Sequence, residues 1–204
     1  MPDEIKRSPR AERRDAAENR RRILSAAQRL FDRHGVEQVS MNQIAAEAGI
    51  GPGTLYRRYR NKSELCLDLN KDNLVRLFEE LETYLTQHRS RPADERLKGT
   101  LDRFIAFREK KAQLLKGVDD SAMATRPKEQ SWNPMEELRR KFAGLFEEMA
   151  EDGPAAAPRS ASLFQADMLL NALTSDAYLF QRNVRGLSPE AILEQLCLLF
   201  IPKR

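Results

Sequence analysis

Apolar side chains recur along this chain at intervals of three and four residues, from near residue 16 to residue 201. This spacing places apolar side chains on one face of an α-helix, whereas a half-buried β-strand alternates apolar and polar positions. No segment alternates over a sustained run, and Ile23, Ala27 and Leu30 show the helical spacing. The pattern therefore predicts an all-α fold of about nine helices.

Start and stop signals divide this pattern into segments. Gly35 provides a left-handed cap after a first helix over residues 16–34. Ser40 and Gln43 form a capping box at the start of a short second helix, and Pro52 suits the first turn of a third helix that ends near Tyr59. Longer helices are expected over residues 62–87 and 92–115, from residue 134 to the stop at residue 153, over residues 163–180, and from residue 188 to residue 201. Residues 1–15 carry no apolar stripe and are expected to form a mobile basic arm.

Positive charge is concentrated at the N-terminal end of the chain. Residues 1–62 hold 14 Lys and Arg against 8 Asp and Glu, a net charge of +6, whereas residues 63–204 hold 21 against 23, a net charge of −2. A basic end attracts nucleic acid or an anionic membrane surface. A merely solvated face has the same composition, so charge alone does not decide between these readings.

The segment around residue 50 has the outline of a helix-turn-helix. Two short helices are joined by a glycine-containing turn and lie behind a longer supporting helix. Ala45 and Gly49 allow the two helices to approach closely, and Ile44, Ile50 and Leu55 supply a small core. A generic three-helix packing module would show the same spacing.

The amino-acid types in this segment are more specific than their spacing. Residues 44–50 read IAAEAGI, residues 53–56 read GTLY, and Tyr59, Asn61 and Lys62 follow. These motifs resemble the tetracycline-repressor (TetR) family of bacterial one-component regulators, and the match extends back through the first helix. Beyond residue 65 the resemblance is one of helix count and chain length. Gly51 departs from the family pattern, which usually has Ser or Thr there as the helix cap.

The resemblance implies a sequence-specific regulator of transcription, usually a repressor, that binds double-stranded DNA. It implies a helix-turn-helix domain over residues 16–64 and an effector-binding and dimerisation domain over residues 65–204. The third helix would lie in the major groove, and Lys62, Tyr59 and Ser40 would hold phosphates. Tyr56 and Tyr59 are alternatively packing residues of a three-helix core. The DNA-binding residues expected from the resemblance are Arg20, Ser40, Met41, Gly51, Pro52, Gly53, Thr54, Tyr56, Arg57, Tyr59 and Lys62.

The resemblance also implies an apolar cavity for a small-molecule effector of unknown identity. Arg108 follows Phe104 by four residues, which places a guanidinium on an apolar helix face where it would pair with an effector carboxylate. An arginine in such a place also commonly extends to water or meets a protein acid, and an aromatic and methionine stripe is commonly core. The candidate lining residues are Phe104, Arg108, Met123, Trp132, Met135 and Phe142.

The last two predicted helices are apolar on more than one side. In residues 163–180, 12 of 18 residues are apolar, too many for a helix that buries one face in its own domain. Pairing with the same helices of a second chain would bury the surplus in a four-helix bundle, so we predict a homodimer; two core helices of a monomer are the alternative. The expected interface residues are Phe164, Met168, Ala172, Leu173, Tyr178, Ile192, Leu196, Leu199 and Phe200.

Other classes of protein find little support in the residues. The chain has two histidines and no complete dinucleotide or phosphate-loop motif, so no catalytic residues are expected. Cys66 and Cys197 have no partners at metal-ligand spacing, and no metal or cofactor is expected. We find no secretory signal or bilayer-spanning segment, so we expect a cytoplasmic protein without a membrane partner. The alternative function is a helical module that binds DNA nonspecifically or lies on a membrane surface, without effector control.

Overall fold

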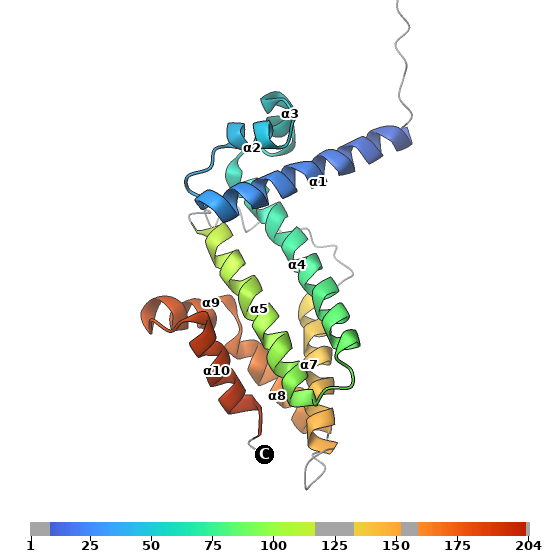
Figure 1. The fold of residues 1–204 in the computed structure, drawn as a ribbon, viewed down its shortest axis with the longest axis vertical. Helices are drawn as coiled ribbons and strands as arrows, with labels where there is room; N and C mark the ends of the chain where they lie inside the picture. Colours follow the sequence, from blue (N-terminus) through green and yellow to red (C-terminus); the bar gives the residue numbers. More distant parts are fainter. Residues whose placement is uncertain (1–8, 117–132, 152–158, 203–204) are drawn as a thin grey trace, which may run out of the picture. The chain divides into compact units, whose positions relative to one another are not determined.

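The computed structural model describes residues 9–116, 133–151 and 159–202, with side chains described from Asp15 onward except that of Arg159. These residues form α-helices and one π-helical stretch, with no β-strand among them, so the all-α prediction is confirmed (Figure 1). The elements are α1 (Pro9–His34), α2 (Met41–Glu47), α3 (Pro52–Arg58), α4 (Lys62–Gln87), α5 (Ala93–Leu115), α7 (Pro134–Glu151), α8 (Arg159–Ala172), α9 (Ser175–Leu179), η1 (Phe180–Val184) and α10 (Pro189–Phe200).

The predicted capping residues begin and end the short helices. The backbone N–H of Gln43 donates to Ser40 Oγ at 3.3 Å, and the Ser40 N–H donates to Gln43 Oε1 at 2.8 Å, which completes the capping box of α2. Gly35 and Gly49 have φ values of 77° and 63°, a region that favours glycine after a helix. These local signals therefore place the turns on both sides of α2.

Two helix boundaries differ from the prediction. The first helix begins at Pro9, so residues 9–15 are helical and do not belong to a mobile arm; alanine, arginine and glutamate favour a helix without an apolar stripe. The predicted helix over residues 163–180 is interrupted after α8. Thr174 Oγ1 accepts a hydrogen bond from the N–H of Ala177 at 3.4 Å and so caps a separate helix, α9. Residues 1–8 of the predicted arm lie outside the described residues.

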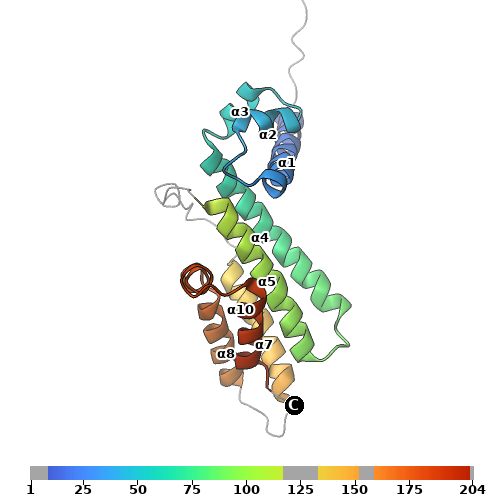
Figure 2. The same ribbon diagram turned by 60° about the vertical axis from the view of Figure 1, so that its left-hand side comes forward.

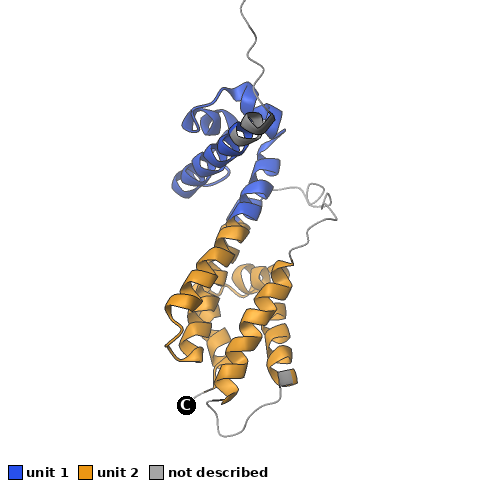
Figure 3. Cartoon of the chain, turned by 90° about the vertical axis from the view of Figure 1, so that its right-hand side faces the viewer, with its two compact units in different colours: residues 1–72, 113–124 blue, residues 73–112, 125–204 orange. Residues whose placement is uncertain are grey.

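The chain divides into two compact units, which Figure 3 distinguishes by colour. The first comprises residues 1–72 and 113–124, and the second comprises residues 73–112 and 125–204. The division falls within α4, between Asp72 and Asn73, and within α5, between Ala112 and Gln113, so both helices contribute to both units.

The core of the first unit is built from small and branched side chains. Ala45 of α2, Ala48 just after it, and Ile23 and Ala27 of α1 pack together, which lets the helices approach closely. Leu55 of α3 is fully buried in the same cluster. Because burial of a leucine side chain contributes about 1.5–3 kcal/mol, Leu55 anchors α3 against α1 and α2.

The second unit is a bundle of longer helices around an apolar core. Leu81 of α4, Leu101 of α5, Phe142 of α7 and Leu169 of α8 are all fully buried in one cluster. The helix α8 packs against α7 and also contacts α10, as Figures 1 and 2 show from two sides. The faces of α8 and α10 that this cluster leaves uncovered lie on the surface of the unit.

Candidate nucleic-acid interface

The helix α3 presents one exposed face and one anchoring residue. Leu55 points into the core of the first unit, whereas Pro52, Gly53 and Arg57 are exposed and Tyr56 is 47% exposed. Tyr56 is therefore not a core residue of this unit. An exposed helix held by a single buried leucine can enter a groove without losing its own packing.

The two glycines at the start of α3 face open space. Gly51 is the cap residue of the helix and supplies no side-chain hydrogen bond, as its type predicts. A Cβ atom added at Gly51 or Gly53 would meet no protein atom within 4 Å. Packing inside the unit therefore does not require glycine at these positions, and the bare backbone leaves room for a partner to approach closely.

Two residues expected at the DNA, Arg20 and Tyr59, donate to the same carboxylate, that of Asp68 in α4. Arg20 Nε of α1 donates to Asp68 Oδ2 at 2.9 Å, and Arg20 Nη1 donates to Asp72 Oδ1 at 3.2 Å. The Tyr59 hydroxyl, just after α3, donates to the same Asp68 Oδ2 at 2.6 Å. The carboxylate of Asp68 thus ties α1 and the end of α3 to the first part of α4.

The charge states in this network reflect both burial and pairing. Burial would raise the pKa of Asp68, but hydrogen bonds from Arg20 and Tyr59 outweigh it and hold that pKa below its usual range. Burial, together with the bond to Asp68, raises the pKa of Tyr59 to about 12. At neutral pH the network therefore contains an ionised Asp68 and a protonated Tyr59, and Tyr59 is a packing residue.

Lys62 also differs from its expected place. Its Nζ donates to the carbonyl oxygens of Val36, Glu37 and Val39 at 2.7, 3.3 and 3.0 Å. An ammonium group has three N–H donors, and all three are directed at backbone oxygens. In this structure Lys62 therefore holds the turn between α1 and α2 against the start of α4.

The remaining expected contacts at α2 divide between surface and core. Ser40 is exposed, and its hydroxyl is held by Gln43 in the capping box. Met41 is 8% exposed and packs in the core of the first unit, because it lies on the same face of α2 as Ile44 and Ala45.

Two exposed cations were missed by the sequence-based list. Arg58 and Arg60 are exposed beside Arg57, and the Arg58 guanidinium donates to the carbonyl oxygen of Ala16 at 3.4 Å. The basic run at residues 57–60 was the available signal. With Arg20 and Lys62 directed inward, Arg57, Arg58 and Arg60 supply the positive charge at and just after α3.

The expected effector residues occupy different environments in the second unit. Phe104, Arg108 and Phe142 are buried, whereas Met135 is 44% exposed at the first turn of α7 and does not line an interior cavity. Met123 and Trp132 lie outside the described residues. The structure thus brings Phe104 and Phe142 into one core cluster and places the Arg108 guanidinium 4.8 Å from the Phe104 ring.

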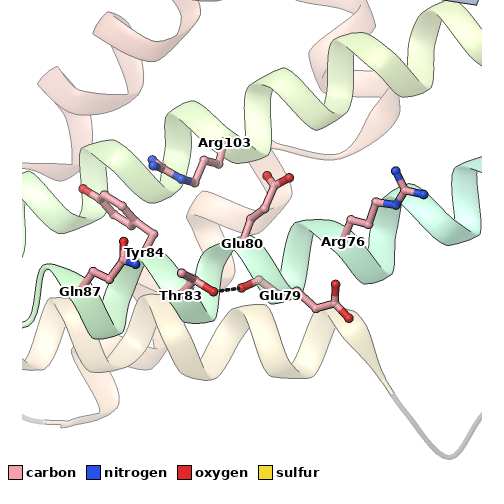
Figure 4. A pocket seen from close by; sticks show the side chains of 7 residues that line it. All are labelled: Arg76, Glu79, Glu80, Thr83, Tyr84, Gln87 and Arg103. Carbon is pink, nitrogen blue, oxygen red and sulfur yellow. Dashed lines mark hydrogen bonds between the residues drawn. The ribbon is translucent and has the colours of Figure 1, made fainter. Parts of the chain in front are cut away.

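A hollow that the sequence did not predict lies between α4 and α5. It has a volume of about 460 Å³ and is open to solvent. Arg103 of α5 stacks over the Tyr84 ring of α4 at 3.8 Å, as the close view in Figure 4 shows. Its other lining residues are Arg76, Glu79, Glu80, Thr83 and Gln87. This polar hollow differs in character from the apolar cavity that the resemblance implied.

The expected interface residues divide between the surface and the core of the second unit. Phe164, Met168, Ala172 and Leu199 are exposed, and Phe200 is half-buried. In contrast, the protomer already buries four of the expected residues in its own core, because they lie on the inward faces of their helices. These are Leu173, Tyr178, Ile192 and Leu196. Sequence reasoning missed Leu198, Phe180 and Val184, which are exposed.

Searches for two other kinds of site found none within the described ranges. No helix there is long and apolar enough to cross a membrane. In the same part of the chain, no three His, Cys, Asp or Glu side chains are grouped as metal ligands.

Comparison with known proteins agrees with the arrangement of α1 to α4. Residues 23–69 match the family model described as bacterial regulatory proteins, tetR family. A helix-turn-helix-type transcriptional regulator of Staphylococcus aureus (strain bovine RF122) is 33% identical over 194 residues, which cover 93% of this chain and 96% of that protein. The corresponding regulator of strain NCTC 8325 is 31% identical over the same shares.

Solved structures share the fold. A TetR transcriptional regulator from Streptomyces coelicolor has a TM-score of 0.52 at 24% identity, covering 91% of this chain and 99% of that one. FadR from Thermus thermophilus, a TetR-family repressor solved in complex with lauroyl-CoA, has a TM-score of 0.52 at 22% identity, covering 91% and 96%.

Proposed function

The chain belongs to the TetR family of transcriptional regulators, and from this premise we propose that it is a repressor that binds a palindromic operator as a homodimer and dissociates when a small molecule binds its second unit. The relatives are DNA-binding regulators and not enzymes. What we propose for this chain is its DNA-contacting residues, its homodimer and its release from DNA by a small molecule.

The exposed face of α3 is the observation that carries the proposal. Recognition helices of this motif enter the major groove and touch base edges near their N-terminal ends. Pro52, Gly53, Thr54 and Tyr56 lie at that end, and Arg57 follows on the exposed face. We assign base contacts to Thr54, Tyr56 and Arg57, close backbone approach to Gly51 and Gly53, and phosphate contacts to Arg58, Arg60 and Ser40.

The structure argues against the membrane-surface alternative. Such a helix would need a continuous apolar face free to enter lipid. The apolar face of α1 is instead buried against α2 and α3, with Ile23, Leu24 and Ala27 less than 2% exposed. A basic α1 without a free apolar face is suited to phosphate attraction alone.

Exposed apolar side chains on neighbouring helices support the proposed homodimer. Phe164 and Met168 of α8 are 63% and 40% exposed, and Leu198 and Leu199 of α10 are 60% and 76% exposed. Because α8 and α10 contact each other, we infer that these side chains belong to one surface, which a second copy would cover by two-fold symmetry. Large exposed apolar patches of this kind mark interaction sites.

Effector control is proposed because the Thermus neighbour, which shares the fold, was solved in complex with lauroyl-CoA, and we assign the effector to the second unit. A ligand changes DNA affinity only if it binds one arrangement of the protein more tightly than another. We place the effector near Phe104, Arg108 and Phe142, the expected residues that are buried in that unit.

Selection of bound fragments from genomic DNA tests the proposal. Enriched fragments are expected to share an inverted repeat whose half-sites are about 10–10.5 base pairs apart or a multiple of this, because a dimer presents two copies of α3. Binding to such a fragment should weaken linearly in log affinity against log salt, with lipid vesicles unable to compete. Equal recovery of unrelated sequences would leave a nonspecific DNA-binding protein.

A further inference from the structure

Arg108 of α5 is a buried cation with an incomplete set of partners. The residue is 8% exposed, and its guanidinium lies 4.8 Å from the Phe104 ring. Arg108 Nη1 donates to Ser175 Oγ at 3.0 Å, whereas the buried Nε has no hydrogen-bond partner among the described residues. Buried N–H groups are nearly always paired, so an unpaired donor on a guanidinium points to a missing acceptor.

No carboxylate among the described residues forms an ion pair with Arg108. Glu109, the adjacent acid, accepts hydrogen bonds from the Tyr178 hydroxyl and Arg182 Nε, each at 2.6 Å. Burial lowers the pKa of Arg108 to about 10, which leaves it charged at neutral pH. Within the described part of the chain, this desolvated guanidinium therefore has no acidic side chain paired with it.

A second cation converges on the same point. Lys111, one turn further along α5, donates from Nζ to Ser175 Oγ at 3.0 Å. Two cationic donors therefore share one neutral hydroxyl oxygen. The hydroxyl accepts from Arg108 but supplies no opposite charge to its guanidinium, whereas a carboxylate or phosphate would do both and would match the fork of the guanidinium.

We propose that Arg108 and Lys111 form an oxyanion site at Ser175, which receives the carboxylate or phosphate group of the effector. The oxyanion takes the place of the Ser175 hydroxyl as the acceptor for both cations, and the apolar part of the effector lies toward Phe104. The assignment rests on the proposed effector control of DNA binding and specifies the chemical class of the effector.

Thermal unfolding with simple anions tests this site in the full chain. Sodium acetate and sodium phosphate are compared with sodium chloride at equal ionic strength, so that the two arms distinguish a carboxylate from a phosphate. At least one oxyanion is expected to raise the unfolding midpoint of the wild-type protein by several degrees above the chloride value, because ligands that bind the folded state stabilise it. Arg108→Met should abolish that rise, and the matched surface change Lys110→Met on the same helix should preserve it.

The midpoint without oxyanions separates a ligand site from a structural role. Replacing an uncompensated buried charge by an apolar side chain is often neutral or stabilising, so Arg108→Met should unfold at or above the wild-type midpoint. An unfolding midpoint several degrees lower would show that Arg108 stabilises the fold and is not a ligand site. A wild-type protein whose midpoint responds to neither oxyanion would overturn the proposed site. Binding of the wild type to its selected operator is measured in parallel, because loss of DNA binding overturns the proposed function and not the oxyanion site.

Discussion

Arginine in place of Leu199 is expected to leave the protein monomeric and to weaken its binding to an inverted repeat by a factor of about 10²–10⁴. Leu199 is 76% exposed on α10, so the protomer's own core does not need it. In the proposed two-fold interface, the two new guanidinium groups would be desolvated without an opposite charge to compensate them. Sedimentation equilibrium measures the mass, and a DNA titration measures the affinity.

Val75→Arg is the matched control for this change. Val75 is also an exposed apolar residue, at 46%, but it lies on α4 and outside the surface formed by α8 and α10. This variant should remain dimeric and bind DNA as the wild type does. If the Leu199→Arg protein remained dimeric and bound DNA with unchanged affinity, α10 would not form part of the interface.

Alanine in place of Arg57 is expected to cost about 1–3 kcal/mol per half-site, and only on operators that keep the base pair it reads. Arg57 is exposed on α3, and no hydrogen bond within the described residues holds its guanidinium. On operators already altered at that base pair, the variant and the wild type should bind with nearly equal affinity. Titration against a set of singly substituted operators measures this dependence.

Arg58→Ala provides the comparison on the neighbouring residue. Arg58 carries the same charge but donates to the Ala16 carbonyl oxygen of α1. Its loss should weaken binding similarly on every operator and reduce the salt dependence, as expected for a phosphate contact. If Arg57→Ala behaved in this uniform way as well, Arg57 would not read bases.

The local signals in the sequence were sufficient for the helix-turn-helix. The capping box at Ser40, the left-handed glycines and the first-turn Pro52 all act through residues within a few positions. Each of these residues starts or ends a helix through hydrogen bonds or backbone angles within its own turn, so their spacing in the sequence predicts the helix boundaries. The first helix was predicted to start at residue 16, whereas α1 starts at Pro9. Residues 9–15 favour a helix by their amino-acid types but lack the apolar periodicity from which helices were predicted.

The roles of Arg20, Tyr59 and Lys62 depended on partners that spacing does not reveal. Asp68 is 48 residues from Arg20, and the carbonyl oxygen of Val36 is 26 residues from Lys62 Nζ. A basic or phenolic side chain near α3 has the same appearance in the sequence whether it faces a phosphate or a protein acceptor. Only the packing of α1 and α4 turns these three residues inward.

The exposed apolar surface that we propose for the dimer was predicted in part, for a related reason. The width of the apolar stripe showed that α8 and α10 carry more apolar surface than one core uses. It did not show which residues the protomer buries, so Leu173 and Ile192 were assigned to the interface while Leu198 was missed. That assignment depends on how the helices rotate against α7 and α5, which is a tertiary property.

Protection of guanine N7 atoms from dimethyl sulfate on a selected operator tests the central claim most directly, because N7 lies in the major groove. Two protected segments are expected, related by two-fold symmetry and centred about 10–10.5 base pairs apart or at a multiple of that spacing. Protection at one of the segments should be lost when its half-site is scrambled. A fully bound operator with every guanine N7 still reactive would show that α3 does not enter the major groove.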